Sequence, residues 1–545
     1  MPSLVLGPLL RHVGEHDATV WVETDAPCAV EVLGHRAETF HVAGHHYALV
    51  LVEGLDGPAP YEVTLDGERV WPLDDDWPAS VIRPIRREQP IDVVFGSCRV
   101  AYPHEPPYTL RKDDDPQGRE VDALRALALK LRGQEPETWP GALLMLGDQI
   151  YADEVEPETE AFIRSRRDTD VPPHTELAGF QEYTYAYKVS WGDPPIRWLL
   201  STVPSAMIFD DHDVIDDWNT SHSWLQDIRA NGWWDERIVG AFSSYWLYQH
   251  LGNLGPEALA KDPLYAAVRE ADDGESILRD FAWRADRTVN STQWSFCRDL
   301  GSARLIMVDS RAGRILDPDR RTMVDDDEWD FIEDHASGHH HDHVLIGTSL
   351  PWLMAPGMHH LEAVSEAVCE GTWGRVAGWL AEKARRAVDL EHWGAFGDSW
   401  AAMRDLVERI GRGEGGEPPA TIVVLSGDVH HAYLAEVAHR RGSGMRSRVY
   451  QAVCSPFRNP LDGKERRVIK TLVSRPVAAF AGALARSAGV EDPGIRWRLR
   501  QDPIFDNVVA TLRLDGRNAS LRIERARPEE EGHAVSLETA YEGAL

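Results

Sequence analysis

One short stretch, an apolar run followed at once by metal-binding side chains, constrains this sequence more than any other feature. Residues 423–425 form a β-type run that ends in Ser426 and Gly427, and Asp428 and His430 follow two residues apart. Ligands of open α/β sheets collect just beyond the carboxyl ends of the strands. Asp428 and His430, on alternate positions past such a strand, can therefore reach two adjacent cations.

The same arrangement recurs, so that chelating side chains follow four strand-like runs. Runs that end near residues 95, 146 and 209 precede Cys98, Asp148 and Asp211. Alone, each residue has a simpler explanation, because a cysteine is often a small buried hydrophobe and Gly-Asp after a strand is commonly a turn or a helix cap. Four occurrences at four strand ends favour one shared metal site over four unrelated loops.

These residue types suit the hydrolysis of phosphate esters. That reaction is assisted by two cations about 3.5–4 Å apart, which clamp the attacking and the leaving oxygen. We expect Asp148 to bridge the cations, with Cys98 and Tyr151 as ligands that suit a trivalent or borderline transition metal. His212 is expected near the departing oxygen, as a general acid or a stabiliser of charge. The ligand set is completed by Asp211, Asp428 and His430.

The order of the predicted elements divides the chain in two. Residues 1–85 read as short alternating strands, which predict a small all-β sandwich of immunoglobulin or fibronectin type without a catalytic cluster. From residue 90 to 545, strands alternate with helical stretches, which predicts an α/β part that carries all the candidate ligands. The chain from about residue 460 is expected to be a C-terminal extension of that part.

Composition excludes several classes of partner. The 57 basic and 89 acidic residues give a net charge of −32, which disfavours nucleic acid or an anionic membrane held by charge alone. Five widely spread cysteines predict no disulfide framework. We see no signal peptide and no apolar run long enough to span a bilayer, and therefore expect a cytoplasmic protein without stable membrane insertion. The oligomeric state is left open.

A later stretch combines basic and apolar residues. Between residues 466 and 486, five basic residues accompany an apolar run from 468 to 484. Such a combination can lie on a membrane surface. Because Pro476 interrupts the run, the simpler expectation is a docked helix that covers the site.

The motifs around the candidate ligands carry a resemblance to a known family. In chain order they are Phe95-Gly96-Ser97-Cys98-Arg99, Gly147-Asp148-Gln149-Ile150-Tyr151, Asp210-Asp211-His212-Asp213-Val214, Asp309-Ser310-Arg311 and Ser426-Gly427-Asp428-Val429-His430. Together they resemble the motifs of the PhoD-like alkaline phosphatases, a branch of the calcineurin-like metallophosphoesterase superfamily. The resemblance runs from about residue 91 to 457, and the small β-domain in front matches the family's layout.

The resemblance implies a fold, an activity and a set of metals. The fold is a four-layer α/β/β/α core, and the activity is that of a phosphomonoesterase or phosphodiesterase acting on a small-molecule phosphate ester with metal-activated water. The metals are Fe³⁺ and Ca²⁺, with other divalent metals as substitutes. The implied iron ligands are Cys98, Asp148 and Tyr151, the implied calcium ligands are Asp148, Asp211, Asp428 and His430, and the catalytic residues are His212, Asp148 and Arg311.

Two features depart from the family pattern. Gly347-Thr348-Ser349 stands where the family has Gly-Asn-Gln, so a contact to metal or phosphate is expected to be weaker or mediated by water. Family members often carry a twin-arginine export signal, and none is seen in this sequence. The missing signal bears on a secreted role and not on the chemistry. Because of the Thr348-Ser349 change, a second hypothesis stays open, namely a catalytically weakened binding or scaffold protein of the same fold that is stabilised by its metals.

Overall fold

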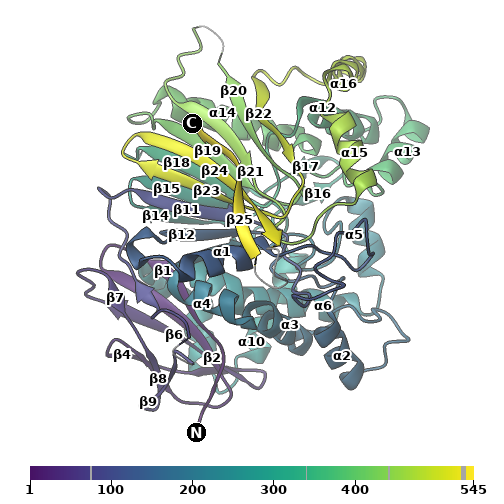
Figure 1. Cartoon of the computed structure of the whole chain (residues 1–545). Helices are drawn as coiled ribbons and strands as arrows, with labels where there is room; N and C mark the ends of the chain where they lie inside the picture. The colour runs from purple at the N-terminus through teal and green to yellow at the C-terminus, as the bar shows by residue number, and fades with distance from the viewer. Residues whose placement is uncertain (74–75, 339, 440–441, 529–534) are drawn as a thin grey trace.

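The protein is described by a computed structural model of the 545-residue chain. The described residues are 1–73, 76–338, 340–439, 442–528 and 535–545. Figure 1 shows the N-terminal strands at one end of the molecule, two larger sheets in its middle, and helices around them.

The N-terminal region is all-β, as predicted from its alternating sequence. The first of its two four-stranded sheets has the order β1 (Leu4–Val13), β2 (Asp17–Thr24), β6 (His45–Glu53), β5 (Phe40–Val42). The second has the order β4 (His35–Glu38), β3 (Ala29–Val32), β8 (Val63–Leu65), β9 (Glu68–Trp71), and β7 (Ala59–Pro60) pairs separately with β10 (Val81–Ile82). The second sheet contains a hairpin, since β8 and β9 pair antiparallel.

This all-β region packs tightly on the remainder of the chain. The guanidinium of Arg11, fully buried, donates to the carbonyl oxygens of Tyr248 and Gln249 at 2.6 and 2.8 Å. The ring of Trp21 lies 5.1 Å from that of Tyr248. Since buried residues of both regions belong to one hydrophobic cluster, the N-terminal strands form part of the main core.

The first central sheet is built from both ends of the α/β part. Its strand order is β13 (Ser205–Ile208), β12 (Ala142–Leu146), β11 (Ile91–Gly96), β23 (Val508–Asp515), β24 (Asn518–Pro528), β25 (Val535–Ala544). The first three strands are parallel, and β23 joins β11 in antiparallel pairing. The C-terminal strands, drawn in yellow in Figure 1, therefore complete the sheet that begins at residue 91.

The second central sheet has seven strands and buries both faces of its central strands β18 (His343–Thr348) and β19 (Thr421–Ser426). Its order is β14 (Phe296–Leu300), β15 (Ala303–Val308), β18, β19, β21 (Arg448–Val453), β20 (Ala432–Ala438), β22 (Arg496–Ile504). In β19, Val423 and Leu425 belong to the core shared with the first sheet, whereas Ile422 and Val424 belong to the core that includes α11 and α14. Burial on both faces explains why this strand reads as a continuous apolar run.

The two sheets approach each other closely at their carboxyl ends. The backbone N–H of Asp428 donates to the Ser97 hydroxyl at 2.9 Å, which joins the end of β19 to the end of β11. A side chain at Gly427 would collide with Ser97, so only glycine fits at this position. The strand ends that carry the candidate ligands are thereby brought together.

Helices and short two-stranded elements complete the fold. The helices before β14 are α1 (Ala123–Arg132), α2 (Pro157–Arg166), α3 (Phe180–Gly192), α4 (Pro194–Thr202), α5 (His222–Arg229), α6 (Trp234–Tyr245), α7 (Leu251–Asn253), α8 (Pro256–Lys261), α9 (Pro263–Glu270) and α10 (Glu275–Arg287), with the 3₁₀ turn η1 (Pro136–Thr138) and the π turn η2 (Trp246–His250). Later elements are β16 (Ile315–Asp317), β17 (Arg320–Thr322), α11 (Asp326–Ala336), α12 (Pro356–Cys369), α13 (Arg375–Arg385), η3 (Trp393–Ala395), α14 (Gly397–Arg412), α15 (Gly463–Leu472) and α16 (Arg475–Ser487).

No single helix in the described part of the chain is long and apolar enough to cross a bilayer. Among the helices that the structure describes, only α15 and α16 taken together, bent by 62° where they meet, reach such a length and composition.

Candidate metal centre

The candidate ligands sit on strand ends whose backbone is unusual. Cys98, Asp148, Asp428 and His430 have φ angles of 56°, 52°, 66° and 50°. Positive φ is uncommon for residues other than glycine, and such strained positions gather at functional sites. Each side chain is thus directed by a sharp bend where its strand ends.

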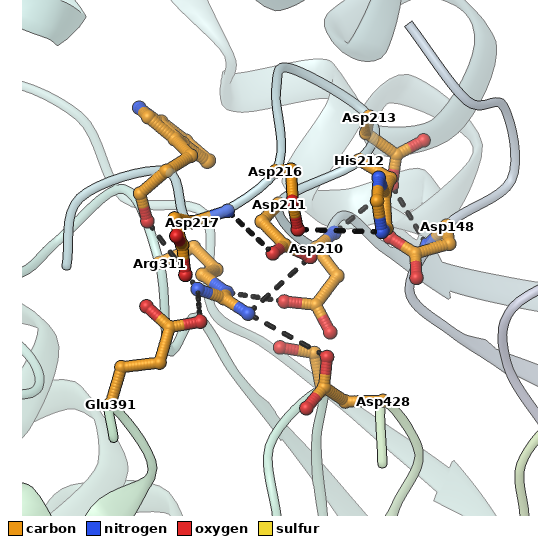
Figure 2. Close-up of polar contacts among 12 residues, drawn as sticks. Asp148, Asp210, Asp211, His212, Asp213, Asp216, Asp217, Arg311, Glu391 and Asp428 are labelled. Carbon is orange, nitrogen blue, oxygen red and sulfur yellow. Dashed lines mark hydrogen bonds and ion pairs between the residues drawn. The ribbon is translucent and has the colours of Figure 1, made fainter. Parts of the chain in front are cut away.

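Three aspartates from two neighbouring strands form the centre of the cluster (Figure 2). Asp148 follows β12, Asp210 and Asp211 follow β13, and oxygens of the three carboxylates lie within 4.8 Å of one another. Burial raises the pKa of Asp148 well above its usual range, and the charges of Asp210 and Asp211 add to this effect. Among the described residues, neither carboxylate oxygen of Asp148 has a hydrogen-bond partner.

A fully buried arginine connects this cluster to the second sheet. Arg311, after β15, pairs through Nε with Asp210 and through Nη1 with Glu391. Its Nη2 atom lies 3.4 Å from Asp211 Oδ1 and 3.6 Å from Asp428 Oδ1. Although burial opposes its charge, the four carboxylates raise the pKa of Arg311, so it remains a cation.

The residues of this cluster fit a cation centre. One guanidinium is shared by four carboxylates, and it makes no contact with Asp148, whose two oxygens stay unpaired in the described structure. An unpaired buried carboxylate is costly unless a cation neutralises it. Asp148, just after the end of β12, is therefore placed to bind metal.

The thiol of Cys98 and the phenol of Tyr151 lie beside the carboxylates. The Cys98 thiol is buried and contacts the backbone oxygen of Asp428 at 3.5 Å and the Ser455 hydroxyl at 3.2 Å. Burial, followed by the charges of Asp148 and Asp428, raises the pKa of Cys98. The Tyr151 hydroxyl accepts a hydrogen bond from Asn459 at 3.2 Å. A bound metal would have to displace both protons, since thiolate and phenolate are the ligating forms.

His212 is held between two further carboxylates. Its Nδ1 atom lies 2.9 Å from Asp153 Oδ1, its Nε2 atom lies 3.7 Å from Asp216, and its ring stacks on Tyr151 at 4.5 Å. Burial lowers the pKa of His212, but the charges of Asp153 and Asp211 outweigh burial and raise it well above the ordinary value. His212 is thus kept as a proton donor.

His430 has the opposite character. Its backbone N–H donates to the Ser455 hydroxyl at 3.2 Å, and burial lowers its pKa to about 3. A neutral imidazole is the form that binds metal. The site therefore holds one neutral histidine, His430, that can bind metal, and one charged histidine, His212, that cannot.

Several residues of the site escaped the prediction from sequence. His392 contacts Asp428 Oδ2 through Nε2 at 3.1 Å and Glu362 Oε1 through Nδ1 at 2.6 Å. A hydrogen bond of this kind fixes the orientation of a ligating carboxylate.

Glu391, which forms an ion pair with Arg311, lies next to His392 in the chain. The sequence gave no indication of these roles, because neither residue directly follows a strand. Asp153, Asp210 and Asn459 were also missed.

The Thr348-Ser349 pair lies at the end of β18, close to the same region. The Ser349 hydroxyl is 2.8 Å from that of Ser310, next to Arg311. Thr348 is fully buried, and its hydroxyl has no hydrogen-bond partner among the described residues.

The fold and site together define a class of protein. It is a mixed α/β protein with an all-β N-terminal region, in which carboxyl ends of strands from two sheets surround buried carboxylates suited to cations.

Comparison with known proteins agrees with this class and specifies the family. Residues 132–478, more than half of the chain, match the model of the PhoD-like phosphatase family, and the chain belongs to that family. Residues 1–82 match a domain of unknown function, DUF7800. No curated protein matches the chain.

One solved structure shows the same fold. The structure of PhoD aligns with a TM-score of 0.58 at 12% identity, covering 98% of this chain and 92% of that one. The purple acid phosphatase PPD1 from yellow lupin (Lupinus luteus) seeds aligns with a TM-score of 0.46 at 11% identity, covering 98% and 73%. The second similarity is too weak to support an argument, whereas the first confirms a PhoD-like core.

Proposed function

We propose that this protein is a metal-dependent phosphoesterase that hydrolyses phosphate monoesters or diesters at the strand ends of a four-layer α/β/β/α core. The observation that carries the proposal is the buried carboxylate of Asp148, unpaired among the described residues and within 4.8 Å of its neighbours Asp210 and Asp211. Membership of the PhoD-like phosphatase family supports the same reaction class.

The proposed cofactors are Fe³⁺ and Ca²⁺. Asp148 would bridge them, Cys98 and Tyr151 would complete an iron site, and the calcium ligands would be Asp211, Asp428 and His430. When bound, such cations would polarise the phosphoryl group, and the trivalent ion would lower the pKa of a coordinated water. The thiol, phenol and carboxylate donors lie close enough for their charges to shift one another's pKa values, which supports a common centre.

Two cationic side chains have different proposed roles. His212, charged and hydrogen-bonded to Asp153, would donate a proton to the leaving oxygen of the ester. Arg311 was predicted to be catalytic. Because it is fully buried and engaged by four carboxylates, we propose that it acts through Asp211 and Asp428, which it positions.

The alternative, a catalytically weakened scaffold protein of the same fold, is favoured by one observation. Thr348 and Ser349 present short hydroxyls where the family pattern has amides, and Ser349 already pairs with Ser310. Such a protein would bind its metals and gain stability from them without turning over phosphate esters.

A chromogenic phosphodiester and a chromogenic phosphomonoester separate the two proposals. The full chain is loaded with iron and calcium, and its turnover is compared with that of the metal-stripped protein. We expect metal-dependent hydrolysis that Asp148→Asn abolishes and that Asp92→Asn, in the body of β11, leaves intact. Turnover no higher than in the stripped control, with the metals bound, would favour the scaffold.

A further inference from the structure

Helix α13 exposes its large apolar residues and buries its small ones. Val376, Trp379 and Leu380 have 76%, 58% and 55% of their surface exposed. The inner side of the helix is formed by Ala377, Gly378 and Ala381, which pack near α12 and α16. Helices of globular proteins usually bury their large apolar residues, so this inverted pattern points to a partner outside the chain.

The neighbouring helices α15 and α16 extend this surface. No residue of α15 is buried, and Val468 on it is 57% exposed. On α16, Phe480 is 66% exposed, while the opposite side packs on α12. Figure 1 shows α13, α15 and α16 around α12, far from the N-terminal strands. We refer to the exposed residues of α13, α15 and α16 as the helical face.

The charge of the helical face is opposite to that of the chain. Residues 463–487 contain six basic residues and one acidic residue, a formal charge of +5, whereas the whole chain carries −32. On α13, Lys383 Nζ lies 3.9 Å from the centre of the Trp379 ring, so a cation and an aromatic side chain are presented together. Basic residues interspersed with exposed aromatic and aliphatic ones are typical of helices that lie on anionic membranes.

We propose that the helical face docks on an anionic membrane surface. The apolar side chains would enter the boundary between headgroups and acyl chains, and the basic ones would contact lipid phosphates. α16 remains packed on α12, and α15 and α16 are bent by 62°, so the chain would lie on the membrane surface. The acidic remainder of the molecule would be repelled by the same lipids, which orients this face toward them.

A second copy of the chain is a poorer occupant. A twofold contact places the same surface on both sides of the interface. A basic surface that includes Lys464, Arg467 and Arg475 would then face a second basic surface, which is unfavourable. An anionic lipid surface satisfies both the apolar and the basic residues.

Vesicle binding by the full chain tests the proposal. Phosphatidylcholine vesicles, with and without phosphatidylserine, are sedimented with the protein at low and at high salt. We expect binding only to the vesicles that contain phosphatidylserine, weakened by salt. Trp379→Ala should reduce the partition coefficient about ten-fold, and Lys464→Gln with Arg467→Gln about thirty-fold, or about five-fold for each charge.

The chain offers a matched control for the aromatic variant. Trp283 on α10 is also exposed and also lies under a cation, with Arg287 Cζ 4.5 Å from its ring. Trp283→Ala should leave vesicle binding unchanged, and circular dichroism checks the fold of every variant. Absence of binding to phosphatidylserine, or equal effects of Trp283→Ala and Trp379→Ala, would overturn the proposal. So would self-association that Trp379→Ala abolishes in a protein that binds no vesicles, because the face would then contact a second copy.

Discussion

Replacing Asp148 by asparagine should stabilise the metal-free protein while it destroys the metal centre. The side chain is 1% exposed, and neither of its oxygens has a hydrogen-bond partner among the described residues. Oxygens of Asp210 and Asp211 lie within 4.8 Å. Two unit charges at that separation repel by about 3.5 kcal/mol at an effective dielectric constant of 20. Because Arg311 and His212 offset part of this repulsion, we expect Asp148→Asn to raise the free energy of unfolding by about 2–4 kcal/mol at pH 8.

The pH dependence of this gain has a definite sign. Burial raises the pKa of Asp148 in the folded protein above the unfolded value of 3.8. Above pH 3.8 the unfolded chain therefore binds fewer protons than the folded protein, and the stability of the wild type falls as the pH rises toward the folded pKa. The asparagine variant lacks this titration. The difference between the two proteins should be small near pH 4 and should grow toward pH 8.

The measurement is thermal unfolding with a chelator and with metals. For a cooperative unit of this length, about 1 kcal/mol corresponds to about 1 °C in Tm, so the variant should melt about 2–4 °C above the wild type in chelator at pH 8. With metals at about one hundred times Kd, the wild type should gain about 2.7 kcal/mol and the variant less. The difference between the Tm of the variant and that of the wild type should therefore become smaller, or change sign, when metals are added.

Asp92→Asn is the control for the loss of a carboxylate. Asp92 lies in β11 and pairs with Arg513 at 3.3 Å on a partly exposed surface. Such a pair contributes about 0–1 kcal/mol, so this variant should be slightly less stable under both conditions. If Asp148→Asn lowers the Tm in chelator at pH 8, or if it gains as much from metals as the wild type, the assignment of Asp148 as the metal-binding carboxylate is wrong.

Three further predictions test the other parts of the site. His212→Ala should lose about 10²–10⁴-fold on alkyl phosphate esters and much less on nitrophenyl esters, which need no proton on the leaving group, while it retains its metals; equal losses would contradict the acid role. Protein purified with iron should show a visible charge-transfer band that Tyr151→Phe shifts or abolishes, and a colourless, iron-free and fully active wild type would exclude this ligand. Thr348→Asn combined with Ser349→Gln should bind metal more tightly in a titration, and unchanged affinity would show that the short hydroxyls weaken no contact.

The carboxylates at the strand ends could be predicted because of how these strands are buried. β12 and β19 have helices or another sheet against both faces, so every residue in them is buried and each reads as an uninterrupted apolar run. A polar residue directly after such a run is conspicuous. Asp148 and Asp428 could therefore be picked out without knowledge of the fold, together with Asp211 after β13.

The residues that orient these ligands could not be found in the same way. Glu362 lies on α12 and His392 directly before η3, and neither follows a strand. His392 contacts Asp428 across 36 residues of sequence, and Glu391 contacts Arg311 across 80. Only the folded chain brings such pairs together, so neither periodicity nor local turn chemistry could reveal them.

The strand order of the first central sheet could not be predicted from the sequence either. The hairpin of β23 and β24 could be predicted from alternation and from the Asp515-Gly516 turn. The strand that pairs with the outer side of this hairpin could not be predicted. Alternation determines which face of a strand is buried, and it carries no information about the neighbouring strand. The pairing of β23 with β11 makes the last strands part of the core, whereas the sequence suggested an extension.

The backbone at the strand ends argues that these side chains are kept for chemistry. In the described structure, thirteen non-glycine residues have positive φ, and Cys98, Asp148, Asp428 and His430 are four of them. That conformation costs about 1–3 kcal/mol at each position, a cost that glycine would remove. The chain uses glycine at positive φ in seventeen described positions, including Gly147, the residue directly before Asp148. Glycine is thus available to this backbone at many bends, and we propose that the strain at the four candidate ligand positions is retained because their thiol, carboxylate and imidazole groups are required there.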